Sequence, residues 1–98
     1  MNELKTTRTT SIIDASKETV NAVYSIRYQY EEYSGKKNLQ AIHVEIAEKQ
    51  EDGVTMNIGN MDYNNGSISM SGFPYSTKTT TYMSEFLEIV EGIKSLIK

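Results

Sequence analysis

His43 is the only histidine of the chain and the first side chain to consider for chemistry, because imidazole serves as a base or a metal ligand near neutral pH. In the alternating pattern of residues 39–49 it falls on the polar side, beside Glu45. The sequence has no cysteine and no second histidine to share a metal ion with it. Catalysis would also need a nucleophile and an orienting group. We therefore expect His43 to be a surface residue.

The other residues that could do chemistry form no convergent set. Glu31 and Glu32 are adjacent in a predicted strand, so they point to opposite faces. The acidic residues within 48–52 surround a predicted hairpin and lack the spacing of a calcium loop. The alternating serines within 67–71 have no base beside them, and no glycine-rich loop opens a helix after a strand. The sequence predicts a protein that is not an enzyme and uses no metal or cofactor.

Length and charge limit the remaining classes. A chain of 98 residues is one domain. The net charge is -3 and the ten basic residues are scattered, whereas a general duplex-DNA binder needs a clustered basic surface. The opening "MNELKTTRTT" lacks the apolar run of a signal peptide, and no stretch approaches the roughly 20 apolar residues that span a bilayer. We expect a cytoplasmic protein with no membrane contact.

The chain divides into a polar arm and a folded part. Residues 1–20 are Thr-rich and polar, so we expect a flexible or weakly ordered N-terminal arm. Within it, Asp14 or Ser16 is a suitable cap for a short helix. Residues 21–98 are expected to form a single α+β domain.

Two strands with one buried side are predicted for residues 21–33 and 39–49, because apolar and polar residues alternate there. The "SGKKN" segment between them is a turn. The inward side of the first strand consists of Ala22, Tyr24, Ile26, Tyr28 and Tyr30. We expect these tyrosines to pack beneath a helix, with their hydroxyl groups at the rim. The alternative is that they face solvent as a platform on which nucleic-acid bases stack.

Two further strands follow residues 39–49, and each is connected to the strand before it by a short hairpin loop. "EDG" suits a three-residue hairpin loop that ends in a glycine of positive φ. The following hairpin has two solutions, a three-residue "NNG" loop or a two-residue Asn65-Gly66 turn. We favour the second with a β-bulge at Gly59, because it brings Met61 and Tyr63 to the core side and pairs them with Met70 and Ile68.

One helix is predicted for residues 82–97. Thr80 or Thr81 can cap it, Glu85 suits its first turn, and Lys94 and Lys98 suit its negative end. The apolar stripe consists of Met83, Phe86, Leu87, Val90, Ile93 and Ile97.

The predicted fold is α+β: a four-stranded antiparallel β-meander with one C-terminal amphipathic helix on one face, in two layers (ββββα). This element order is similar to that of the PC4-like single-stranded-DNA-binding domains, which are dimers. The resemblance is one of topology and implies a single-stranded nucleic-acid binder. The residues available for such binding are Arg27, Lys36, Lys37, Tyr75 and Lys78.

Our first hypothesis is nevertheless a small non-catalytic interaction module, a homodimer that acts through protein–protein contacts, for example as an accessory or inhibitor protein of a mobile element. Ile89, Gly92 and Leu96 lie at the shoulder of the helix stripe and are candidates for self-association. The strand 21–33 and the fourth strand are the expected free edges of the sheet, which a second copy can pair with.

Overall fold

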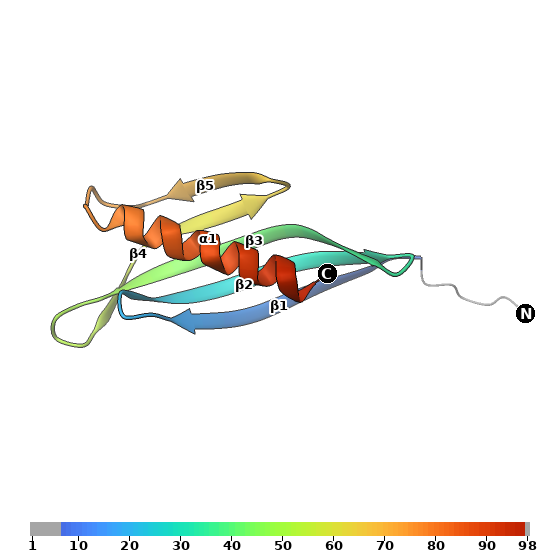
Figure 1. Cartoon of the computed structure of the whole chain (residues 1–98). Coiled ribbons are helices and arrows are strands. Elements are labelled where there is room, and N and C mark those ends of the chain that lie inside the picture. The colour runs from blue at the N-terminus through green and yellow to red at the C-terminus, as the bar shows by residue number, and fades with distance from the viewer. Residues whose placement is uncertain (1–6, 98) are drawn as a thin grey trace, which may run out of the picture.

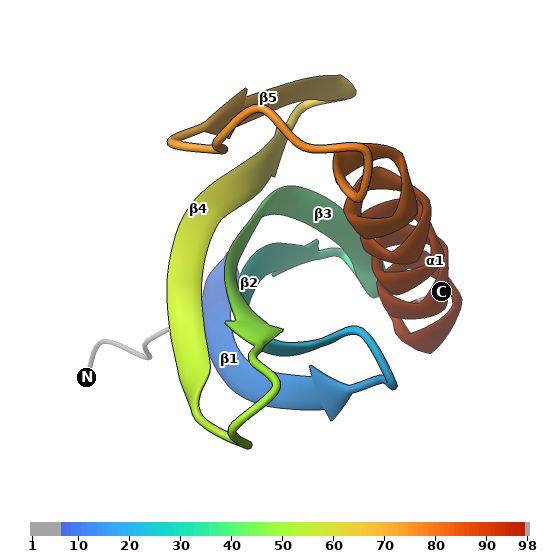
Figure 2. The same cartoon turned by 90° about the vertical axis from the view of Figure 1, so that its left-hand side faces the viewer.

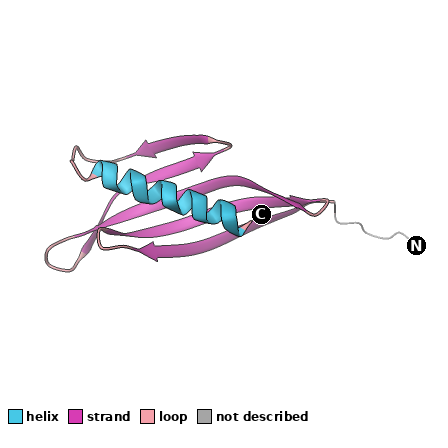
Figure 3. Cartoon of the chain, viewed as in Figure 1, coloured by secondary structure: helices cyan, strands magenta, loops and turns pink. Residues whose placement is uncertain are grey.

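The computed structural model describes residues 7–97 and has two layers, a curved antiparallel sheet and one helix (Figures 1 and 3). The strands follow each other in the sheet in chain order, so the sheet is a meander. Seen from its end, the sheet curls so that the helix lies across its open side (Figure 2). The elements are β1 (Thr9–Glu18), β2 (Ala22–Tyr33), β3 (Lys36–Lys49), β4 (Thr55–Asn64), β5 (Ser67–Ser71) and α1 (Thr79–Leu96).

The α+β meander with a C-terminal helix is confirmed, but the sheet has five strands instead of four. The additional strand, β1, lies in the expected weakly ordered arm, and it pairs with β2 from Thr9 to Glu18. The helix start expected at Asp14 or Ser16 is therefore wrong. Threonine and isoleucine favour extended backbone. However, β1 is an edge strand in which only Ser11 and Ile13 are partly buried, so its sequence shows no clear alternation. Residues 1–6 of the arm lie outside the described residues.

The tyrosine face of β2 is in the core, as predicted. Tyr24 is fully buried opposite Ile46, and Tyr28 is buried opposite Ile42. The turn after β2 is shorter than expected, because only Ser34 and Gly35 form it, both with positive φ. β3 consequently begins at residue 36, and the register shift that follows Gln29 leaves one extra β3 residue there. The stacking-platform alternative is excluded for these buried rings.

The bulge at Gly59 and the two-residue turn at Asn65-Gly66 are both confirmed. Ile46 pairs with Gly59 and Ala47 pairs with Asn57, so one extra residue lies on β4 at this point. Met61 is fully buried as a result.

The paired residues of β5 are less buried than their position on the core side suggested. Met70 pairs with Met61 and Ile68 with Tyr63 as predicted, yet both β5 side chains keep a large exposed fraction. The reason is the position of α1, whose main sheet contact is with β3, in the middle of the sheet.

The helix begins earlier and is rotated relative to the prediction. The Ser76 hydroxyl accepts a hydrogen bond from the Lys78 N–H at 3.1 Å, and neither Thr80 nor Thr81 caps the helix. Glu85 lies beyond the first turn, whereas Lys94 lies in the last turn as expected. Among the described residues, no helix combines the length and apolar character needed to cross a membrane. The buried stripe consists of Tyr82, Phe86, Ile89, Val90, Ile93 and Ile97.

Met83 and Leu87 were expected in this stripe and are instead exposed by 37% and 44%. Tyr82 takes the inward position at the start of the helix, where its ring packs at 6.4 Å from that of Phe73. Inclusion of Tyr82 and Ile89 moves the centre of the stripe away from the Met83–Leu87 flank, since successive helical residues are 100° apart.

Two carboxylates tie the helix to the sheet. Glu85 accepts hydrogen bonds from Thr19, Asn21 and Tyr24 at the β1–β2 connection. Glu48 of β3 accepts hydrogen bonds from the Tyr82 hydroxyl at 2.5 Å and from the Gln50 amide at 3.1 Å. These polar groups at the rim fix where α1 lies along the sheet.

The same contacts shift the pKa values of three side chains. Burial, followed by the hydrogen bond to Glu85, raises the pKa of Tyr24 well above its ordinary value. Burial and the hydrogen bond to Glu48 raise the pKa of Tyr82 in the same way. The hydrogen bond from Tyr82 lowers the pKa of Glu48, against a smaller opposing effect of burial.

We expect the free energy of unfolding to fall at both ends of the pH range, and Tyr82→Phe to weaken both dependences. The raised folded pKa of Tyr82 gives stability that is present below the unfolded value of about 10 and is lost as pH rises above it. The lowered folded pKa of Glu48 gives stability that is present above its ordinary value of 4.5 and is lost as pH falls through the folded pKa. Urea unfolding over a pH series measures both. Parallel curves for the wild type and Y82F would contradict this assignment.

Candidate functional site

The outer face of the sheet, opposite α1, carries a polar row that crosses all five strands. Cross-strand pairing places these residues side by side in the order Asp14, Arg27, His43, Asp62 and Ser69. The row arises because each residue lies at an outward position of its strand and the registers align. His43 is therefore on the polar side, as predicted.

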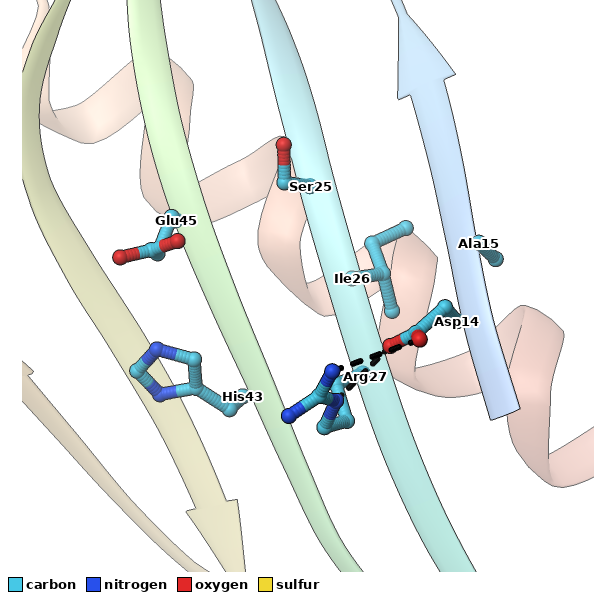
Figure 4. A pocket seen from close by; sticks show the side chains of 7 residues that line it. All are labelled: Asp14, Ala15, Ser25, Ile26, Arg27, His43 and Glu45. Atoms are coloured by element: carbon cyan, nitrogen blue, oxygen red, sulfur yellow. Dashed lines mark hydrogen bonds and ion pairs between the residues drawn. The ribbon is translucent and has the colours of Figure 1, made fainter. Parts of the chain in front are cut away.

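A hollow of about 410 Å³ lies on this face over β1, β2 and β3 (Figure 4). Its lining residues are Asp14, Ala15, Ser25, Ile26, Arg27, His43 and Glu45. The Arg27 Nε lies 2.8 Å from Asp14 Oδ1, and this hydrogen bond lowers the pKa of Asp14. Both partners of the pair are mostly exposed, so the pair contributes little to stability.

His43 forms no nucleophile–base pair with the side chains that line this hollow. His43 Nδ1 lies 2.6 Å from Asp62 Oδ1, so Asp62 orients the ring. Ser25 lines the same hollow, but it pairs with Glu45 across the strands and makes no hydrogen bond to His43 within residues 7–97. In the same residues no group of three His, Asp or Glu side chains is arranged to hold a metal ion.

The residues expected to bind nucleic acid do not converge. Lys36 and Lys37 lie at the β2–β3 hairpin, where the Lys37 ammonium group is 5.7 Å from the Tyr30 ring centroid. Tyr75 is fully exposed, and it and Lys78 lie before the first turn of α1, near the opposite ends of those strands. The β2 strand between the two ends spans about 36 Å at 3.3 Å per residue. Arg27 lies between them on the outer face and is paired with Asp14.

The helix residues expected to mediate self-association have mixed positions. Ile89 is only 5% exposed and belongs to the core, so its side chain offers little surface to a second copy. Gly92 is exposed, and Leu96 is 73% exposed. With Tyr28 and Ala15 they border a groove of about 250 Å³ between α1 and the β1–β2 side of the sheet.

We expect Gly92→Ala to raise the free energy of unfolding by about 1 kcal/mol, because alanine is the better helix former. Apart from its own helix backbone and chain neighbours, a Cβ at residue 92 meets no atom of residues 7–97 within 4 Å. If a second copy packed against Gly92, the new methyl group would weaken the assembly. Urea unfolding and light scattering together decide: higher stability with an unchanged mass is the expected result. Gly66→Ala is the control, because the positive φ of Gly66 makes the same substitution costly there.

A second surface was missed in the sequence analysis. Four of the large exposed apolar side chains belong to β5 and to α1, and they are 37–48% exposed: Ile68, Met70, Met83 and Leu87. We call these four residues the β5 face.

The two elements of the β5 face lie on the same side of the core. Met83, Leu87 and Lys94 share one flank of α1, because they are separated by four and seven residues. The Lys94 ammonium group lies 5.2 Å from the ring centroid of Tyr63, which pairs with Ile68 of β5. Met83 and Leu87 therefore face the side on which β4 and β5 lie.

One sequence signal pointed to this surface. Residues 63–77, which include all of β5, contain no Asp, Glu, Lys or Arg. The β5 face was missed because its members fit the apolar pattern of a core, and pattern alone does not tell how far a single helix reaches.

The free edges of the sheet also differ from those expected. β1 covers the strand expected as one edge, so the two edges are β1 and β5. The β5 edge is the fourth strand of the prediction, and that part of the expectation holds.

Assignment of a role depends on the residues of this chain alone. Comparison with protein-family models, with curated proteins and with solved structures found no match.

Proposed function

We propose that this chain is a small non-catalytic interaction module, a homodimer that acts through protein–protein contacts made by the β5 face and the adjoining sheet edge. The observation that supports this most is the exposure of Ile68, Met70, Met83 and Leu87, which the Lys94–Tyr63 contact and the pairing of Tyr63 with Ile68 place on the same side of the core. Scattered apolar residues are normal on a surface, but a contiguous exposed patch marks an interaction site.

The sheet edge gives this surface a second means of binding. An exposed edge strand accepts an extended segment of a partner, whose backbone supplies affinity while alternate side chains supply specificity. In β5 the alternate side chains on the core side are Ile68 and Met70. A partner strand at this edge would place its own apolar side chains against the β5 face.

Single-stranded nucleic acid, the alternative partner, has less support. The basic and aromatic residues that would bind it are spread over both ends of β2 and the outer face. Base stacking needs exposed aromatic rings along a basic groove, and the rings of Tyr24 and Tyr28 are buried.

Site-specific photo-crosslinking in the cells that produce the chain tests the proposal. A benzophenone side chain at residue 70 is expected to yield discrete protein adducts. The same group at residue 16, exposed on β1, is the matched control and is expected to yield none. Absence of protein adducts from residue 70, or adducts with nucleic acid only, would contradict a protein-binding role for this face.

A further inference from the structure

The β5 edge is short, but it lacks the charged side chains and proline that protect many edge strands. Natural sheets block their edges with charged side chains, proline or bulges. The β1 edge follows this rule, because it contains Asp14, Lys17 and Glu18. β5 has the sequence SISMS and contains no charge and no proline. An unprotected edge beside exposed apolar side chains is suited to pairing with another strand.

The hairpin geometry determines which backbone groups of β5 are free. Asn65-Gly66 is a two-residue turn between Asn64 and Ser67, so these flanking residues form a hydrogen-bonded pair. Bonded and non-bonded pairs alternate along an antiparallel ladder. The backbone groups of the odd-numbered β5 residues therefore point to β4, and the N–H and C=O groups of Ile68 and Met70 point to the open edge.

We propose that β5 pairs antiparallel with β5 of a second copy about a two-fold axis at Ser69, which joins two sheets into one. This inference rests on the proposed function and names its partner and register. Ile68 then lies opposite Met70 of the second copy, and Ser69 lies opposite Ser69. The free backbone N–H and C=O groups of Ile68 and Met70 in the two copies then form four hydrogen bonds across the axis. A shift of the register by two residues in either direction leaves fewer of the five residues paired.

Charge favours a second copy as the occupant. Each chain has a net charge of -3, and residues 63–77 carry none of its charged side chains. Two copies that meet at β5 therefore bring together the part of the chain where like charges are absent. On the β1 edge, charged side chains would have to be desolvated or matched.

The apolar side chains agree with this register. Residues directly opposite in an antiparallel pair project from the same face of the sheet. Ile68 and Met70 of both copies would therefore form one apolar strip on the core side. With Met83 and Leu87 on either flank, each copy contributes a patch on the order of several hundred Å², the size that marks interaction surfaces on soluble proteins.

Cysteine crosslinking tests the register, since the chain has no cysteine of its own. Ser69 and its symmetry mate form a non-hydrogen-bonded pair, whose Cα atoms are about 4.5 Å apart, within the range of a disulfide. Ser69→Cys is expected to form a disulfide-linked dimer with oxidised glutathione. Ser67→Cys and Ser71→Cys are the matched controls: neither crosslinks alone, and an equimolar mixture of the two crosslinks, because residue 67 faces residue 71 across the axis.

Light scattering measures the mass of the assembly without a covalent crosslink. The wild type is expected at twice the chain mass of 11.1 kDa, and Ser69→Lys at the mass of one chain, because two like charges would lie directly opposite each other. The new lysine lies beside Asp62 within its own sheet, so the fold tolerates it. Ser16→Lys on β1 is the control and is expected to remain dimeric.

The outcomes separate this inference from the proposed function. A wild type of single-chain mass, or crosslinking of Ser67→Cys alone in place of Ser69→Cys, overturns the β5 pairing. A wild type of single-chain mass also contradicts the homodimer of the proposed function, and adducts of residue 70 with other proteins in cells would then leave only its protein-binding part standing. If residue 70 yields no protein adduct at all, the proposed function fails as well.

Discussion

Replacement of Gly59 by alanine is expected to lower the free energy of unfolding by about 3 kcal/mol, through strain and overpacking together. Gly59 has a φ of +152°, which residues with a side chain rarely adopt. A Cβ there would lie 2.6 Å from the Ser71 carbonyl oxygen and 2.9 Å from Cδ2 of Phe73. The carbonyl belongs to β5, so it cannot move without disturbing the β4–β5 pairing.

Gly53→Ala is the matched control for this substitution. Gly53 also has a positive φ, +85°, but a Cβ there meets no atom within 4 Å in the described part of the chain, its two neighbours aside. It is expected to cost only the backbone strain, about 1–2 kcal/mol. Urea unfolding of both variants measures the difference. Equal losses would mean that the close approach of β5 and Phe73 to the bulge does not constrain residue 59.

The second large effect is expected for Glu85→Ala, with a loss of about 2–3 kcal/mol in the free energy of unfolding. The Glu85 carboxylate lies 3.0 Å from the Thr19 hydroxyl and 3.2 Å from the Asn21 amide, and it also accepts the hydrogen bond of Tyr24. Alanine leaves the fully buried Tyr24 without this partner. Buried donors that lose their acceptor cost the most of any hydrogen-bond change.

Two further substitutions are the controls for Glu85→Ala. Glu85→Gln keeps one acceptor oxygen and is expected to lose less than alanine. Glu88→Ala removes an exposed carboxylate 3.9 Å from Lys17 and is expected to change stability by less than about 0.5 kcal/mol. Thermal or urea unfolding of the three variants is the measurement. A loss for Glu88→Ala equal to that for Glu85→Ala would contradict the anchoring role of Glu85.

The two anchors also bear on the proposed binding surface. Glu85 and Glu48 hold α1 from the β1–β2 connection and from the end of β3. The Glu85 contacts lie on the flank of α1 opposite Met83 and Leu87, and the Glu48 contact lies at the start of the helix. Together they hold the helix in a position that does not cover β5. A partner at the β5 face therefore meets a surface that is already formed, which lowers the ordering cost of binding.

Much of the fold could be predicted from local signals. Alternation in residues 21–33 placed Tyr24 and Tyr28 on the core side, because a strand has only two faces and the other one carried Arg27. The Gly59 bulge could be predicted because the Asn65-Gly66 turn puts Met61 on the core side, whereas simple alternation would then put Ile58 on the opposite side. One inserted residue brings both onto the core side. The first strand could not be found in this way, since an exposed edge strand needs no apolar alternation.

Local sequence accounts for the alternation of β2, for the Gly59 bulge and the Asn65-Gly66 turn that set the registers between β3, β4 and β5, and for the uncharged character of residues 63–77. These depend on neighbouring residues, whose backbone preferences act locally. The position of α1 across the curved sheet follows from tertiary contacts, and this position buries Ile89 and leaves Met70 and Leu87 exposed. That position depends on Tyr82, Glu85 and their partners 34 and 61–66 residues away, and a local pattern holds no information on such contacts.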